Sequence, residues 1–231
     1  MNYSHTCLLA AALFVRTASG AVFQFDGPDF EVRNGERITA VDWGNTAITL
    51  QAGSVTAPGH SPGSQVTGSQ TWNGGAAYEW EINKVDGTAG ASPGWDLITI
   101  NGGLQINATP ADPFTIKIIS LTLGNQPGPV QNFNSQASAS WKILGASFGV
   151  NDFNVNAFHI DTSQFQNTLN GTFNVSLANL DRDLVLSYVT SVPEPPNGAA
   201  LAAAALLAFA FVRSQTERRN RQEQPKSKRH D

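Results

Sequence analysis

Cysteine and charged side chains are both scarce in this chain of 231 residues. The single cysteine, Cys7, excludes a disulfide framework within the chain and any cysteine-rich metal site. Charged residues make up 14% of the sequence, against about 25% in an ordinary soluble domain. The apolar fraction of 41% is nevertheless large enough for a buried core, so wholesale disorder is excluded.

Basic residues are especially scarce in the main part of the chain. Residues 21–197 carry 15 acidic and 6 basic side chains, for a net charge of −9. Residues 213–231 carry 7 basic and 3 acidic side chains, for a net charge of +4. A body with this charge argues against nucleic acid as a partner, because nucleic-acid binding requires a basic face.

The familiar spacings of catalytic and metal-binding residues are also missing. The four histidines, His5, His60, His159 and His230, form no HxH, HExxH or Cys/His pattern, so we expect no transition-metal site. There is no Gly-x-Ser-x-Gly elbow, and no glycine-rich phosphate loop leads into a helix. The sequence therefore predicts no enzyme, no cofactor and no metal ion.

A short apolar run lies close to the N-terminus. Residues 7–15 (CLLAAALFV) are too few to span a bilayer but have the length of a signal-peptide core. Small residues follow at positions 18–20, so we predict a signal helix within residues 1–20 and cleavage before Ala21. The alternative is a buried N-terminal helix.

A second apolar run, residues 198–212 (GAALAAAALLAFAFV), lies near the C-terminus. At about 1.5 Å per residue this single apolar helix would measure about 22 Å, less than the roughly 30 Å hydrocarbon core of a bilayer. The basic residues that follow it predict that the tail stays on the cytoplasmic side while residues 21–197 are exported. The alternative is a C-terminal core helix.

Prolines at positions 193, 195 and 196 hold the segment before this run extended. A Pro-Glu-Pro motif, an apolar helix and a basic flank thus follow one another over residues 191–221, and residues 222–231 add a polar basic tail. The motif residues are Val192, Pro193, Glu194 and Pro195, and the basic flank contains Arg213, Arg218 and Arg219.

This order resembles the PEP-CTERM sorting signal of Gram-negative bacteria. The resemblance implies recognition and processing by an exosortase, a membrane-embedded enzyme. It also implies that the precursor is held transiently in the inner membrane by its C-terminal helix. The mature protein would then reach the cell surface or the extracellular matrix. Family tails usually end within a few residues of the arginines, so the longer tail here is a departure.

Residues 21–190 alternate between apolar and polar side chains at the period of a β-strand. Turn signals such as Asn73-Gly74-Gly75 separate the alternating segments. We therefore predict an all-β body that is either a β-solenoid (β-helix) or a β-sandwich. The expected buried residues are Tyr78, Trp80, Ile82, Ile98, Ile100, Leu104, Ile106, Phe114, Ile116 and Ile118.

Part of this body resembles a second family. The segments concerned are 61–63 (SPG), 78–83 (YEWEIN), 94–100 (GWDLITI) and 103–106 (GLQI). They resemble the closing rungs of passenger regions built from autotransporter-associated β-strand repeats, over about residues 40–125. The resemblance implies a β-solenoid in that part. The strands after residue 125 are expected to form a cap or a small sandwich.

Three sets of side chains are candidates for chemistry or binding. Glu79 and Glu81 leave one strand on the same side, as a glycosidase pair would, although a solvated strand face is the better interpretation. Asp181 and Asp183 supply two carboxylates for calcium, but two carboxylates at a hairpin tip usually form only a polar turn. Trp72 is the candidate for an exposed ring that contacts a glycan.

The sequence thus predicts an exported, surface-sorted structural or adhesive protein of the cell envelope or extracellular matrix. A secreted carbohydrate-binding module is the alternative, and a secreted glycoside hydrolase is a third hypothesis. The expected partners are the exosortase and an extracellular polysaccharide.

Overall fold

The computed structural model describes residues 29–39, 42–59 and 61–191. The described chain is all-β, as predicted, and its one helical element is the short 3-10 helix η1 (Val155–Ala157). The predicted signal helix and C-terminal apolar helix lie outside the described residues, as do His60 and the whole sorting motif.

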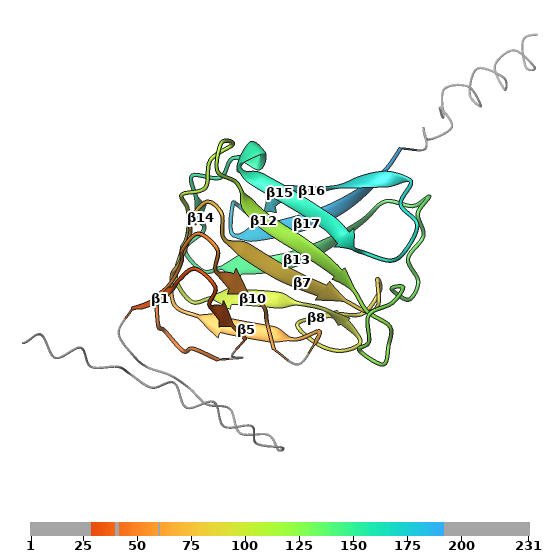
Figure 1. Ribbon diagram of the computed structural model, residues 1–231, viewed down its shortest axis with the longest axis horizontal. Helices are drawn as coiled ribbons and strands as arrows, with labels where there is room; N and C mark the ends of the chain where they lie inside the picture. Colours follow the sequence, from red (N-terminus) through yellow and green to blue (C-terminus); the bar gives the residue numbers. More distant parts are fainter. Residues whose placement is uncertain (1–28, 40–41, 60, 192–231) are drawn as a thin grey trace, which may run out of the picture.

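The strands form three sheets (Figure 1). Sheet A contains, in spatial order, β1 (Phe30–Val32), β3 (Ile48–Leu50), β6 (Gln70–Trp72), β11 (Leu104–Ile106) and β14 (Val150–Asn151). Sheet B contains β15 (Phe158–Gln164), β12 (Phe114–Ser120), β7 (Ala77–Ile82), β4 (Val55–Thr56) and β2 (Arg37–Ile38). The short strand β9 (Gly94–Trp95) pairs with β7, and β8 (Thr88–Ala89) pairs with β9.

Sheet C contains β16 (Gly171–Ala178), β17 (Asp183–Thr190), β13 (Ala139–Ala146), β10 (Leu97–Ile100) and β5 (Ser64–Thr67). The chain visits sheets A, B and C in turn and then returns to sheet A, so that β6, β7 and β10 make one coil and β11, β12 and β13 make the next. Each strand of these coils pairs in parallel with its counterpart in the preceding coil. Such pairing does not fit a sandwich, whose sheets are antiparallel.

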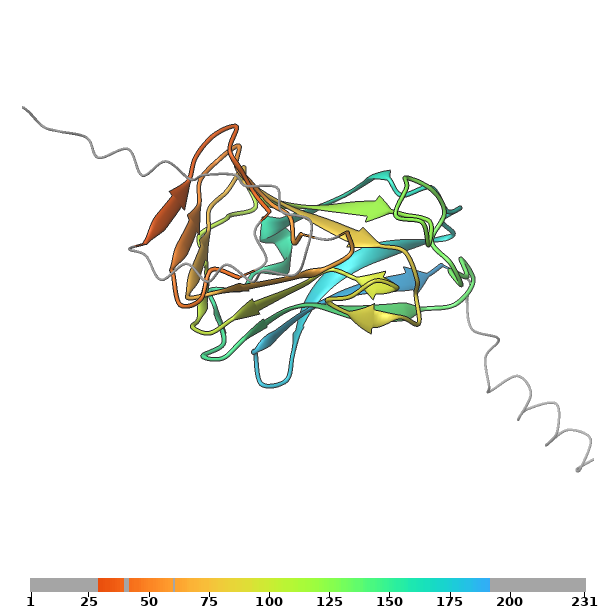
Figure 2. The ribbon, with the colours of Figure 1, turned by 90° about the horizontal axis from the view of Figure 1, so that it is seen from below.

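The last two strands depart from this pattern. After β15 the chain forms an antiparallel hairpin, in which β16 pairs with β17 and β17 pairs with β13 (Figure 2). The expected separate cap or small sandwich after residue 125 is therefore only partly right. Coiling continues through β13, β14 and β15, and the hairpin then extends sheet C because a tight turn at residues 179–182 reverses the chain.

Inward-pointing side chains of the three sheets form one core. All ten residues that the alternation assigned to the core are buried, and Tyr78, Trp80 and Phe114 have no measurable exposure. The core is rich in ring contacts, among them Trp72 stacked on Phe114 with centroids 4.2 Å apart. Alternation along each strand thus predicts which face is inside, because successive side chains point to opposite faces.

Corners between sheets C and A are very tight, and small residues make this tightness feasible. A Cβ atom at Gly68 would lie 2.1 Å from the carbonyl oxygen of Asn45, and one at Gly102 would lie 2.1 Å from the Ser69 hydroxyl oxygen. Since real side chains do not approach so closely, only glycine lets these corners stack on one another.

Candidate functional site

Glu79 lies on the outer face of sheet B between two cations. Its carboxylate pairs with the Arg37 guanidinium from β2, two strands away, and with Lys117 Nζ from the neighbouring β12 at 3.6 Å. The Glu79 side chain is only 14% exposed, whereas those of Arg37 and Lys117 are 45% and 33% exposed. Both carboxylate oxygens are therefore occupied, and the three side chains link strands from three coils.

Glu81, two residues further along β7, faces the corner that leads into sheet C. Its carboxylate accepts a hydrogen bond from the Ser61 hydroxyl. Burial raises the pKa of Glu81, and the nearby Glu79 charge adds to this, whereas Ser61 and Arg37 act in the opposite direction. Glu79 and Glu81 thus lie on the same side of β7, as predicted, but their surroundings differ.

Asp96 is the buried carboxyl group of this corner. Its two oxygens accept the backbone N–H groups of Gly63, at 2.6 Å, and of Glu81, at 2.9 Å. The Asp96 side chain has no measurable exposure, and burial raises its pKa well above the usual value, although the two backbone hydrogen bonds oppose the shift. Burial raises the pKa of Tyr78, and the charges of Asp96 and Glu81 add to this. Asp96 therefore joins the segment before β5 to β7.

Glu79, Glu81 and Asp96 form a carboxyl cluster, and most of its contacts act as ties between different coils. Each oxygen of Glu79 and Asp96 already has a cation or an N–H donor. Glu81 accepts from the Ser61 hydroxyl, and burial raises its pKa. The contacts of Glu79 with Arg37 and Lys117, and of Asp96 with Gly63, connect residues 33 to 42 positions apart in the sequence and so tie different coils together.

Replacing Lys117 with alanine tests how much the outer ion pairs stabilise the fold. Both partners are partly exposed, so we expect the free energy of unfolding to fall by no more than about 1 kcal/mol. The loss should shrink further at high salt, because salt screens exposed charges. Urea denaturation at two ionic strengths measures both effects, and a loss above about 2 kcal/mol would contradict this view of the pairs.

Trp72, the predicted glycan-contact residue, is not exposed, so that prediction is wrong. Its side chain is entirely buried, and its indole N–H donates to Gln70 Oε1 at 2.7 Å. Gln70 in turn donates to the Thr67 hydroxyl at 3.0 Å. The ring points inward because Gln70, Trp72 and their counterparts on β3 and β11 share the inner face of sheet A. Trp80 is buried, as predicted, and Trp95 is partly buried against the core.

The other candidate residues lie apart from the carboxyl cluster. Asp183 pairs with Lys142 Nζ at 2.7 Å, and Asp181 is exposed in the turn between β16 and β17. His159 is exposed on β15. Among the residues that the structure describes, no three His, Cys, Asp or Glu side chains gather as they would around a metal ion.

A row of amide side chains along sheet A was not foreseen from the sequence. Asn73 Nδ2 donates to Gln51 Oε1 at 3.2 Å, and Asn107 Nδ2 donates to Asn73 Oδ1 at 3.1 Å. Gln105 Nε2 continues the row to Asp152 Oδ2 at 2.7 Å. The signal in the sequence was an amide residue at the end of successive strands, but only the register of the coils shows that these residues meet.

No known protein family matches the chain, and no curated protein is similar to it. None of the residues in ranges 29–39, 42–59 and 61–191 belongs to an apolar helix of membrane-spanning length.

Proposed function

We propose that this chain is an exported structural and adhesive protein of the cell envelope or extracellular matrix. The observation that carries the proposal is the order of motif, apolar helix and basic flank over residues 191–221. On this proposal an exosortase reads Val192-Pro193-Glu194-Pro195 while the helix holds the precursor in the inner membrane. Arg213, Arg218 and Arg219 fix the direction of the helix, with the tail on the cytoplasmic side.

We propose further that the coiled body is a β-solenoid, as the resemblance over residues 40–125 implies. Support comes from the return of the chain through three sheets and from the parallel pairing between successive coils. A stack of this kind buries a continuous core and presents regular polar faces along its length. Such a body suits a passive scaffold, and the cross-coil ties at Glu79 and Asp96 are consistent with that role.

Carbohydrate binding is a second candidate function, favoured by one observation. Two large apolar side chains, Phe148 and Leu180, are strongly exposed on neighbouring turns. Sugar-binding sites pair such side chains with a few hydrogen-bonding groups.

Mass spectrometry of the mature protein from its native envelope tests the sorting proposal. We expect the mature chain to end close to Pro195, because the prolines keep this segment extended and accessible to the processing enzyme. Changing Pro193 and Glu194 together to alanine should leave the precursor uncleaved and associated with the cell. Its mass should then include residues 198–231.

Lys228→Ala is the matched control, because it lies beyond the basic flank and should leave processing unchanged. Peptides from residues 214–231 on the surface-exposed form would show instead that the tail is retained. The sorting proposal would then have to be abandoned.

A further inference from the structure

The two most exposed large apolar side chains among the described residues belong to neighbouring turns. Phe148, in the corner between β13 and β14, is 80% exposed, and Leu180, in the turn between β16 and β17, is 91% exposed. Isolated exposed apolar residues are common on protein surfaces, whereas adjacent ones mark interaction sites. Their relative placement therefore decides whether they form a site.

Backbone hydrogen bonds hold these two turns side by side. Ala146 N–H donates to the Arg182 carbonyl oxygen at 2.8 Å, and Val150 N–H donates to the Asp181 carbonyl oxygen at 2.7 Å. On its other side, Phe148 N–H donates to the carbonyl oxygen of Gly102 in the preceding coil at 3.0 Å. The turns that carry Phe148 and Leu180 are thus fixed to the coil rather than free to move apart.

Folding alone does not explain a leucine at position 180. Its backbone φ is +54°, in the left-handed region, which side chains other than those of Gly, Asn and Asp rarely adopt. The neighbours Asn179 and Asp181, with φ of +53° and +61°, are residue types that tolerate this region. Leu180 has an unfavourable backbone and also exposes its side chain to water, so the stability of the fold does not account for a leucine at this position.

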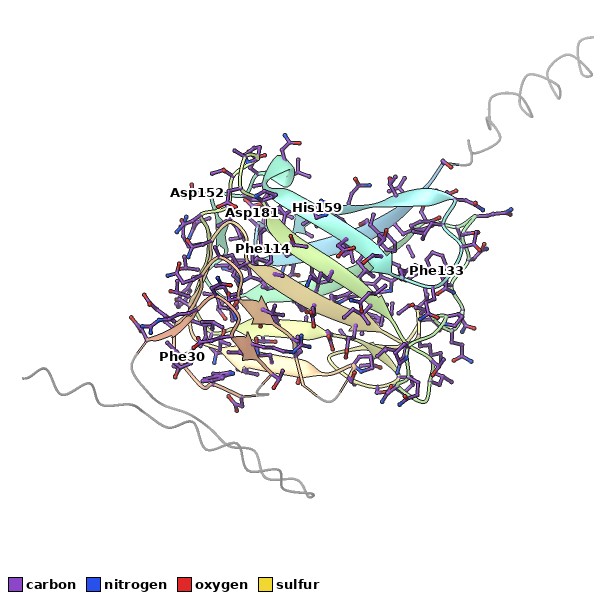
Figure 3. All side chains as sticks on the ribbon, in the orientation of Figure 1. Phe30, Phe114, Phe133, Asp152, His159 and Asp181 are labelled. Carbon is purple, nitrogen blue, oxygen red and sulfur yellow. The ribbon has the colours of Figure 1, made fainter. Side chains whose placement is uncertain are left out.

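The polar side chains around the two turns include amides and carboxylates, and also the exposed Arg182, which directly follows Asp181. Asn151 and Asp152 follow Phe148 in the chain, and Gln105 donates to Asp152 Oδ2 at 2.7 Å. Figure 3 marks Asp152 and Asp181 at this same end of the molecule. A Cβ atom at Gly103 would lie 3.9 Å from Phe148 Cβ and 3.8 Å from Asn151 Nδ2, so Phe148 and Asn151 both lie close to this glycine.

We propose that these residues form a site for a neutral polysaccharide, which we call the end patch (Phe148, Leu180, Asn151 and Asp152). The apolar side chains would contact the C–H faces of sugar rings, and the amide and carboxylate groups would bond to hydroxyls. Asp152 and Asp181 outnumber Arg182 here, so the net negative charge disfavours polyanions and anionic lipid, which bind basic surfaces. This proposal rests on the proposed function in one respect, namely that the exported protein meets extracellular polysaccharides.

A glycan array that carries neutral and uronic-acid-containing microbial oligosaccharides, probed with the purified full-length protein, tests the end patch. We expect the protein to be retained on neutral glycans. Phe148→Ala should bind them with about a tenfold weaker apparent affinity, because it loses a central apolar contact. Leu180→Asn should weaken binding likewise. It should also keep or raise the denaturation midpoint, because asparagine tolerates the left-handed backbone.

Leu123→Ala is the control, because Leu123 is half exposed in the loop after β12 and does not belong to either turn. This variant should bind glycans as the unaltered protein does. Absence of any retained neutral glycan, a preference for acidic glycans, or equal binding by Phe148→Ala would each overturn the proposal. Array binding does not depend on C-terminal processing. A failure here therefore leaves the mass-spectrometric test of sorting intact, and the converse also holds.

Discussion

Replacing Trp72 with alanine is expected to lower the free energy of unfolding by about 3–5 kcal/mol. The indole ring is fully buried and stacked on Phe114, and its N–H is bonded to Gln70. Truncation would open a large cavity and leave Gln70 Oε1 without its donor, since a buried polar group costs free energy when unpaired. Urea or thermal denaturation monitored by circular dichroism measures the loss.

Phe148→Ala is the matched control for this experiment. Phe148 is also aromatic but is 80% exposed, so its removal should change stability by less than about 0.5 kcal/mol. Similar losses for the two variants would mean that Trp72 is not packed in the core as described.

Asp96→Asn should produce the second large effect and lower the free energy of unfolding by about 1–3 kcal/mol at mildly acidic pH. An asparagine oxygen can accept one of the two N–H groups that Asp96 serves, but its NH₂ group cannot accept the other. Of the donors at Gly63 and Glu81, one is therefore left buried and unpaired.

The difference in the free energy of unfolding between the unaltered protein and Asp96→Asn should also depend on pH. Because burial raises the pKa of Asp96 above its usual value of 3.8, the folded protein binds this proton more tightly than the unfolded chain does. The stability that protonation contributes is present below pH 3.8 and is lost as pH rises through the raised pKa. The advantage of the unaltered protein over Asp96→Asn should therefore narrow toward alkaline pH.

Glu81 and Tyr78 also face Asp96, and Arg37 supplies a more distant positive charge. The difference between the two unfolding curves at each pH therefore reports Asp96 together with its electrostatic effect on these neighbours. A difference that stays constant between pH 4 and pH 8 would disprove the assigned pKa direction.

Strand identity and core residues could be predicted from the sequence because both depend on local alternation. The segment from Tyr78 to Ile82 shows apolar and polar residues in turn, and its apolar members are buried. Trp72 was misassigned because its own strand, β6, has a glutamine inside, so that alternation of residue type failed there. The turn glycines at positions 74 and 75 then suggested exposure wrongly.

Contacts between coils could not be predicted because the coils differ in length. Registered partners on sheet A lie 18 positions apart from Phe30 to Ile48, and 22 apart from Ile48 to Gln70. The next intervals, to Leu104 and then to Val150, are 34 and 46 positions. No fixed repeat exists. The sequence spacing therefore predicts neither the ion pair of Glu79 with Lys117 nor the pairing of the turns that carry Phe148 and Leu180.

The largest share of the growth in coil length lies at one corner. Connections from sheet B to sheet C comprise residues 57–63, 83–96 and 121–138 in successive coils, whereas those from sheet C to sheet A comprise only 68–69, 101–103 and 147–149. Inward positions on β5, β10 and β13 remain in parallel register despite these insertions. The corner between sheets B and C therefore accommodates connections of different length, and a foreign epitope inserted at the exposed Ala137 would leave the buried Leu121 and Val130 in place.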